Sequence, residues 1–197
     1  MGVLVVAKKR NLSRFLYGCI RYMPSDFMAN VRYRFYTLIN LKVGMNAFIS
    51  VGAKLDIWDS SVPHSVGNCF FLGENSIISG GVMIGDNVSI NSNVNITASP
   101  PSLISIGNDC LIGQNVVIRS DNHVFEDVDR LIRQQGHIGA NINIEDDVWI
   151  GANTVVLKGV CIAAHSIVAA GSIVTKSFPP YSIIAGNPAR LIKMRKN

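Results

Sequence analysis

The sequence lacks the cysteine and histidine patterns that mark disulfide frameworks and metal sites. Its four cysteines are Cys19, Cys69, Cys110 and Cys161. They form no CxxC pair and no cluster with histidine, so we interpret them as reduced thiols in a cytosolic protein. The four histidines show no close ligand spacing, and the nearest two, His123 and His137, are fourteen residues apart. We therefore predict no metal site.

Long apolar runs are also absent. The run Val3–Ala7 is too short for a membrane span or for the core of a signal peptide, and it precedes rather than follows the basic residues. The sequence therefore predicts neither a leader nor a membrane span. A chain of 197 residues suits one domain with a small appendage, and its hydrophobic content of 48% fits a well-buried core.

Acidic residues are nearly missing from residues 1–42, where Asp26 is the one acid. The basic residues there are Lys8, Lys9, Arg10, Arg14, Arg21, Arg32, Arg34 and Lys42. The segment carries +7, and because the whole chain carries +5, the remainder sums to −2. Apolar residues at helical spacing predict two short basic helices, separated by Pro24-Ser25-Asp26. We favour a cap on an open end of the main fold, with peripheral contact to an anionic membrane as the alternative. Nucleic acid is not favoured, because no binding motif is present.

What the chain does contain is an aliphatic residue at every sixth position. Between residues 144 and 176 these are Ile144, Ile150, Val156, Ile162, Val168 and Val174. The same spacing runs from Val66 to Ile96 and from Ile106 to Ile118. Neither a helical period nor simple strand alternation explains a period of six, whereas the hexapeptide repeat of a β-helix does.

Each hexad predicts one short strand and one corner, and three hexads make one coil of a three-sided prism. Most fifth positions hold small residues, because little room remains beside the buried aliphatic. Most fourth positions hold Asn, Asp or Gly, which tolerate positive φ at tight corners. Successive coils would pair about 4.8 Å apart. We predict an all-β parallel β-helix over residues 43–193, with an irregular first coil at 43–65 and an extruded loop at 124–143.

Several motifs resemble those of the hexapeptide-repeat acyltransferases. They are LGENSI, IGDNVS, IGNDCL, IGQNVV and WIGANTVV, followed by AGSIVTK and AGNPARLIK. The resemblance covers roughly residues 66–193. It is closest to the sugar O-acetyltransferases, including the maltose and galactoside enzymes and those that modify O-antigen and capsule.

The resemblance implies a left-handed β-helix and a cytoplasmic homotrimer with sites between neighbouring subunits. It also implies transfer of an acetyl group from acetyl-CoA to a sugar hydroxyl in cell-surface polysaccharide biosynthesis. Three alternatives stay open: an antibiotic or serine as acceptor, a metalloenzyme like the γ-class carbonic anhydrases on the same prism, and a non-catalytic assembly β-helix.

His123 is the predicted catalytic base. Acyl transfer to a hydroxyl needs a base that works near neutral pH, and His123 lies where the repeat opens into the long loop. In the resembling acetyltransferases, a histidine at this point is the base. Asp121 or Glu126 is expected to orient its ring. His137 could contact substrate, and His165 is interpreted as a structural corner residue.

The acyl donor is expected along one wall of the prism. Ala152 and Ala170 are eighteen residues apart and should stack in adjacent coils, leaving a smooth wall for a pantetheine arm. In the resembling enzymes, these positions and those of Thr175, Lys176 and Arg190 line the coenzyme A groove.

The resemblance also assigns the acceptor side. Trp149 matches a residue that borders the active site, with packing between subunits of the trimer as the alternative. Asn93 and Asn95 match an NxN motif in which an asparagine binds the sugar. Counting hexads places Asn95 and His123 on different faces of one prism. The count therefore predicts that they meet only across a subunit boundary.

Overall fold

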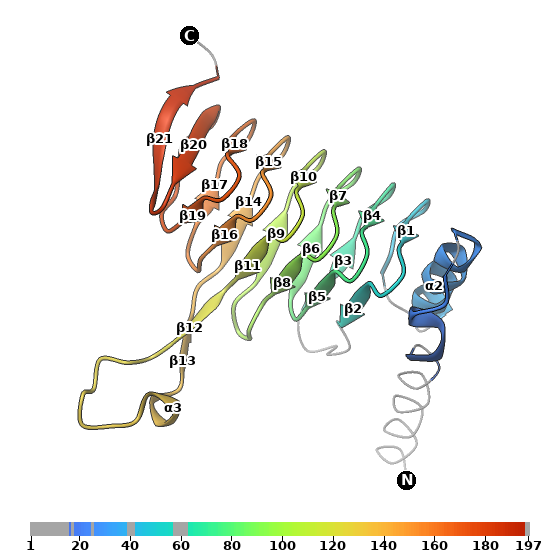
Figure 1. Ribbon diagram of the computed structural model, residues 1–197, viewed down its shortest axis with the longest axis horizontal. Coiled ribbons are helices and arrows are strands. Elements are labelled where there is room, and N and C mark those ends of the chain that lie inside the picture. The colour runs from blue at the N-terminus through green and yellow to red at the C-terminus, as the bar shows by residue number, and fades with distance from the viewer. Residues whose placement is uncertain (1–15, 17, 25, 39–41, 57–62, 196–197) are drawn as a thin grey trace.

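The computed structural model describes residues 16, 18–24, 26–38, 42–56 and 63–195. They form an elongated prism of short parallel strands with a helix at its N-terminal end (Figure 1). An arm projects from the prism, and a hairpin ends the chain. The basic residues 8, 9, 10 and 14 of the predicted N-terminal segment lie outside the described residues.

The prism has three faces, numbered here in the order in which the chain reaches them. Face 1 contains β1 (Phe48–Ile49), β4 (Phe71–Leu72), β7 (Ser89–Ile90), β10 (Leu111–Ile112), β15 (Trp149–Ile150), β18 (Ile167–Val168), β20 (Ser182–Gly186) and β21 (Ala189–Met194). Face 2 contains β2 (Lys54–Asp56), β5 (Ile77–Ser79), β8 (Asn95–Thr97), β11 (Val117–Arg119), β16 (Val155–Val156) and β19 (Ile173–Val174). Face 3 contains β3 (Ser65–Val66), β6 (Val82–Ile84), β9 (Ile104–Ile106), β14 (Ile142–Ile144) and β17 (Cys161–Ile162).

The aliphatic residue of each hexad is buried, as the repeat predicts. On face 1, Leu72, Ile90, Ile112, Ile150 and Val168 stack in register, and each is at most 2% exposed. Each coil supplies the backbone hydrogen-bond partners of the next, so the narrow core and the ladders reinforce each other. The predicted parallel β-helix is confirmed.

The corners follow the predicted chemistry. Between faces 1 and 2, one row of residues with positive φ consists of Gly52, Asn75, Asn93, Asn115, Asn153 and Gly171. Between faces 3 and 1, His165 has a φ of 62° and belongs to a row of residues with positive φ that consists of Asn46, Cys69, Asn87, Asp109, Asp147, His165 and Tyr181. Its Nδ1 lies 2.9 Å from Asp147 Oδ2, and its ring stacks on Tyr181. The expected structural role of His165 is confirmed.

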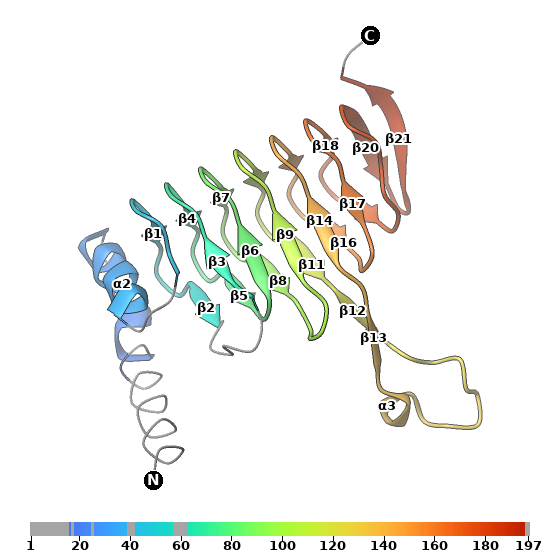
Figure 2. The same cartoon turned by 180° about the vertical axis from the view of Figure 1, so that it is seen from behind.

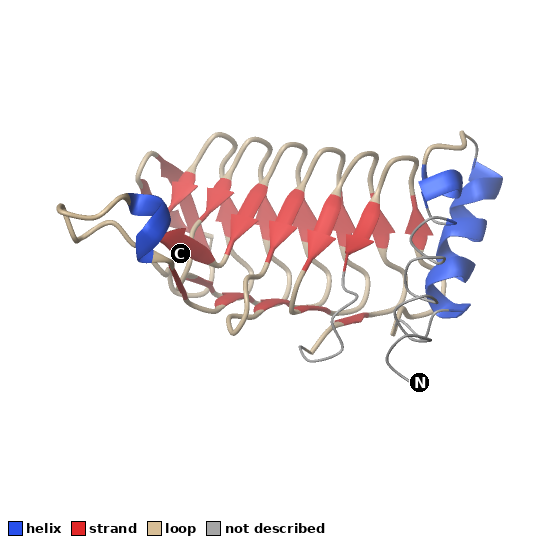
Figure 3. Ribbon diagram, turned by 90° about the horizontal axis from the view of Figure 1, so that it is seen from below, coloured by secondary structure: helices blue, strands red, loops and turns tan. Residues whose placement is uncertain are grey.

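Helix α2 (Asp26–Leu38) covers the first coil, as Figure 3 shows. Arg32 of this helix is buried, and its Nε donates a hydrogen bond to the carbonyl of Ile49 at 2.8 Å. The buried Tyr36 hydroxyl accepts the N–H of Leu55 at 2.9 Å. These bonds satisfy backbone groups at the open end of the prism, so the predicted cap is present. Within the described residues, no helix is long and apolar enough to cross a membrane.

The arm leaves the prism between faces 2 and 3 (Figure 2). It consists of β12 (Asp121–His123), α3 (Ile132–Gln135) and β13 (His137–Gly139), with β12 and β13 antiparallel. Its ends meet where the N–H of Ala140 donates to the carbonyl of Ser120 at 2.9 Å. The extruded segment is therefore 121–139 rather than 124–143. Asn122 stays exposed instead of completing a hexad, whereas the apolar residues of β14 already belong to the core.

Candidate active site

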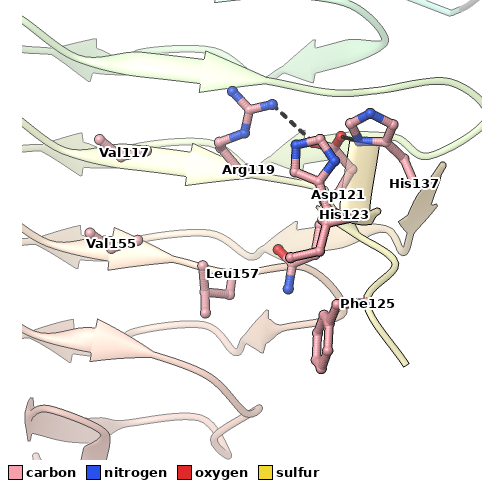
Figure 4. Close-up of a pocket in the computed structure, with 10 residues that line it drawn as sticks. Val117, Arg119, Asp121, His123, Phe125, His137, Val155 and Leu157 are labelled. Carbon is pink, nitrogen blue, oxygen red and sulfur yellow. Dashed lines mark hydrogen bonds and ion pairs between the residues drawn. The ribbon is translucent and has the colours of Figure 1, made fainter. Parts of the chain in front are cut away.

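A cavity of ≈ 650 Å³ lies between the arm and face 2, and we call it the arm cavity. The prism contributes Val117, Arg119, Val155 and Leu157 to its lining. The arm contributes Asp121, Asn122, His123, Phe125, Ile132 and His137 (Figure 4). The prism side is therefore apolar except for Arg119, and the arm side combines polar and charged groups with Phe125 and Ile132.

Asp121 links two of the basic residues that line the cavity. Its side chain is only 6% exposed, and its Oδ1 accepts a hydrogen bond from Arg119 Nη2 at 3.1 Å. Its Oδ2 lies 3.2 Å from His137 Nδ1. Burial opposes ionisation of this carboxyl, but hydrogen bonds from Ser99 and Arg119 and the charges of Arg119 and His137 outweigh it. The pKa of Asp121 is therefore lowered.

His123 faces His137 across the arm hairpin. The two residues are register partners in β12 and β13, and their ring centroids are 4.2 Å apart with planes at 41°. Asp121 was expected to orient His123, but among the described interactions its carboxylate contacts His137 instead. Glu126, the other expected orienting residue, accepts the N–H of Phe125 at 3.1 Å and does not line the cavity.

A second hollow of ≈ 630 Å³, the Trp149 groove, follows the corner between faces 1 and 2. Trp149 is 52% exposed there, and Gly151, Ala152 and Ala170 belong to the lining. The predicted stacking is present, because the N–H of Gly171 donates to the carbonyl of Ala152 at 2.8 Å. A Cβ on Gly151 would lie 2.5 Å from the Ala170 nitrogen, so adjacent coils approach as closely as glycine allows. Small residues therefore form this part of the groove wall.

The expected cations lie nearer the C-terminal end. Thr175 and Lys176 follow β19 and are exposed, with Lys176 Nζ 5.7 Å from the ring centroid of Phe178. Arg190 lies in β21, and its guanidinium donates to the carbonyl of Ala189 at 3.0 Å. None of the three lines the Trp149 groove.

The two asparagines of the NxN motif differ in position. Asn93 is an exposed corner residue with a φ of 59°. Asn95 lies in β8, where its Oδ1 accepts the Thr97 hydroxyl at 2.8 Å. It pairs with Val117, which lines the arm cavity. Placing Asn95 and His123 on different faces was wrong, because the chain leaves the prism after Ser120 and His123 does not turn onto the next face.

Arg119 is the charged lining residue that was not predicted from the sequence. Residues 117, 119, 121 and 123 all line the arm cavity, which is the alternation expected when one extended strand continues from β11 into β12. The signal was therefore present in the sequence as R-x-D-x-H. Within the described parts of the chain, no group of three or more His, Cys, Asp or Glu side chains could hold a metal ion.

Comparison with known proteins agrees with this geometry. The family model described as "Bacterial transferase hexapeptide (six repeats)" matches residues 141–176. The model described as "Hexapeptide repeat of succinyl-transferase" matches residues 63–98 and 103–120. Together these matches fall on the prism and leave out α2 and the arm.

Two galactoside O-acetyltransferases are among the similar proteins. The Escherichia coli protein is 37% identical over 52% of this chain and 49% of its own length. The Lactococcus lactis protein is 33% identical over 66% of this chain and 61% of its own. The chain thus matches about half to three fifths of these relatives.

A solved structure extends the similarity to nearly the whole chain. The hexapeptide-repeat acetyltransferase of Vibrio cholerae, complexed with acetyl coenzyme A, is 29% identical with a TM-score of 0.67. It covers 95% of this chain and 87% of its own. The repeat, the family matches and this similarity agree: the chain is built of hexapeptide repeats and is similar to the hexapeptide-repeat acyltransferases.

Proposed function

We propose that the protein transfers an acetyl group from acetyl-CoA to a hydroxyl of a sugar, with His123 as the general base. The observation that carries this proposal is the exposed imidazole of His123 in a cavity walled by the arm and face 2. An imidazole is suited to accept a hydroxyl proton near neutral pH. The relatives named as galactoside O-acetyltransferases support a sugar acceptor.

The Trp149 groove fits the donor. Its floor is kept low by Gly151, Ala152 and Ala170, so an extended pantetheine arm could lie against the backbone. Among the described residues, the N–H groups of Ala152 and Ala170 donate to no acceptor of the chain, which leaves them for the amide carbonyls of that arm. Thr175, Lys176 and Arg190 lie beyond the groove toward the C-terminal end, where the two cations suit the phosphates of coenzyme A.

The chemistry follows from these parts. The imidazole of His123 takes the proton of the acceptor hydroxyl. At the same time, the hydroxyl oxygen bonds to the carbonyl carbon of the thioester. The carbon–sulfur bond then breaks, and the imidazolium returns the proton to the leaving thiolate. Backbone N–H groups of the wall stabilise the oxyanion, a contribution of about 3–4 kcal/mol per donor. Among the residues that the structure describes, no serine or cysteine lines the arm cavity, which favours direct transfer over an acyl-enzyme.

A complete site requires two copies of the chain. The arm cavity and the Trp149 groove share no lining residue and adjoin opposite edges of face 2. We propose a homotrimer in which the arm of one subunit covers the Trp149 groove of its neighbour. Asn95, outward on face 2 beside Val117, would then contact the acceptor near His123.

The finer assignments concern acceptor and location. We propose a cell-surface polysaccharide precursor as acceptor, made in the cytoplasm, with serine and antibiotics as alternatives. Exposed Leu16, Tyr22, Phe27 and Leu38 at the capped end would suit peripheral contact of segment 1–42 with an anionic membrane. Flotation with anionic and neutral liposomes at low and high salt tests that contact. If the protein does not float with anionic liposomes at low salt, segment 1–42 serves only as a cap.

The activity is tested with His123→Ala and a panel of sugars, glycan precursors, chloramphenicol and serine. We expect kcat to fall at least about 10²-fold while the variant still binds coenzyme A. His165→Asn is the matched control, because it removes a histidine outside both hollows and inserts a usual corner residue. Turnover of His123→Ala close to that of the wild type would reject the proposal.

Subunit sharing is tested by mixing two inactive variants. His123→Ala removes the base, and Ala170→Trp fills the groove at an exposed position. Refolding the two together should restore part of the activity, because some hybrid boundaries combine an intact arm with an intact groove. Full activity of a monomer in light scattering would contradict a shared site.

A further inference from the structure

The two strands of the arm hairpin supply no buried apolar side chain to support the His123 ring. Strand β12 has one buried residue, Asp121, and β13 has none. An exposed imidazole on so short a hairpin would sample several rotamers unless a neighbour restricted it. The ring that packs on His123 is His137, with centroids 4.2 Å apart.

His137 is itself held in place from the prism. Its Nδ1 lies 3.2 Å from Asp121 Oδ2, although its side chain is 55% exposed. Asp121 is in turn fixed by Arg119 at the end of β11 and by a hydrogen bond from Ser99. The contacts therefore run from the prism through Asp121 to His137, and from His137 to His123 (Figure 4).

We propose that His137 is a positioning residue for the general base. The buried carboxylate of Asp121 fixes the His137 ring, and that ring forms the surface against which His123 is oriented toward the acceptor hydroxyl. This inference rests on the proposed role of His123. It assigns Asp121 to His137, so the carboxylate acts on the base through a second ring rather than by direct contact.

Two substitutions separate the two features of His137. His137→Phe keeps a ring for packing but removes the nitrogen that faces Asp121. His137→Asn places an amide nitrogen near the position of Nδ1 but removes the ring. His137→Ala removes both, and Ile138→Ala is the matched control, because Ile138 is the next residue of β13 and does not line the cavity.

We expect His137→Ala to lower kcat by about 10- to 100-fold, the scale of a misplaced catalytic group, with the KM for acetyl-CoA unchanged. His137→Phe and His137→Asn should fall between it and the wild type, and Ile138→Ala should stay within about twofold. If kcat stays at the wild-type value in His137→Ala, or falls equally in Ile138→Ala, the positioning role is refuted.

A double-mutant cycle shows whether His137 acts through His123. His137→Ala should slow the wild type but not the residual turnover of His123→Ala, because no base remains to be positioned. Equal slowing in both backgrounds would overturn the inference. By NMR, cross-relaxation between the two imidazoles should be present in the wild type, and the His123 ring signals should shift in His137→Phe less than in His137→Ala.

The outcomes also separate this inference from the proposed function. Normal turnover of His123→Ala would reject His123 as the base. A slow His123→Ala variant beside a His137→Ala variant with normal turnover would leave the base in place and reject only the role of His137.

Discussion

The prism and the arm differ in what holds them together. In the prism, every coil repeats the same buried aliphatic positions and the same backbone ladder, as the register of β10 between β7 and β15 shows. In the arm, the two strands pair with each other alone, and their attachment depends on one buried carboxylate with its partners. The prism therefore has redundant stabilisation, and the arm has almost none.

Because of this difference, the candidate catalytic residues lie on the arm, where few residue types are required for folding. The first and fifth positions of each hexad must fit the core, so their residue types are restricted to aliphatic or small. The arm has few such restrictions, so His123, His137 and the carboxylate between prism and arm can be chosen for function. The same contrast predicts how the two regions respond to substitution.

The largest expected effect is on stability and belongs to the prism. Ile150→Ala opens a cavity in a fully buried stack and should lower the free energy of unfolding by about 3 kcal/mol. Ile138→Ala, on the half-exposed arm strand, should change it by less than about 0.5 kcal/mol. Urea denaturation of both variants measures the contrast. Equal losses would show that the arm is as tightly integrated as a coil.

Removing the arm should abolish activity but leave the stability of the prism almost unchanged. Residues 123–137 can be replaced by Asn-Gly, a turn suited to joining Asn122 to Ile138, which are register partners. The acetyl-transfer rate should fall at least about 100-fold, because the base is lost. The circular dichroism spectrum should be retained, and the melting temperature should stay within about 5 °C. A collapse of the prism would show that the arm supports the coils.

Alkaline pH should weaken the prism through Cys110. Burial raises the pKa of this thiol to about 11 from a usual 9.0, with Asp146 and Asp147 adding to the effect. The thiol stays protonated longer in the folded state, so its stabilisation is complete below pH 9 and is lost as pH rises toward 11. The loss corresponds to about 2–3 kcal/mol. Cys110→Val, which installs the residue usual at fifth positions, should flatten the decline, and parallel pH curves for both proteins would contradict this origin.

Acid should weaken the arm through Asp121, and this is the smallest effect. Because the folded-state pKa of Asp121 is lowered, its stabilisation is complete above the usual aspartate value of about 4 and is lost as pH falls below it. Hydrogen exchange of the β12 and β13 amides should accelerate there relative to prism amides at the same pH. In Asp121→Asn, this difference between arm and prism should no longer depend on pH. An unchanged pH dependence in the variant would exclude Asp121 as the cause.

The prism could be predicted from residue spacing alone. A buried aliphatic every six residues, with small and left-handed neighbours, specifies each coil locally, so Ile150, Asn153 and Thr154 could be placed from spacing alone. The stacking of Ala152 on Ala170 followed from the same count, because no residue is inserted between their coils. Even His165 could be assigned to a corner, since the repeat fixes where corners occur.

The contacts within the arm could not be predicted in this way. Spacing could not show that the chain leaves the prism after Ser120, because that depends on whether Asn122 can enter the core. Counting hexads therefore placed Asn95 and His123 on different faces. Asp121 was expected to contact His123, whereas its carboxylate contacts His137. The contact between His123 and His137 arises from an antiparallel pairing across thirteen intervening residues, which no local period encodes. Periodic burial can be predicted from a sequence because it repeats. A single pairing that does not repeat forms only when the chain folds back on itself, so no period predicts it.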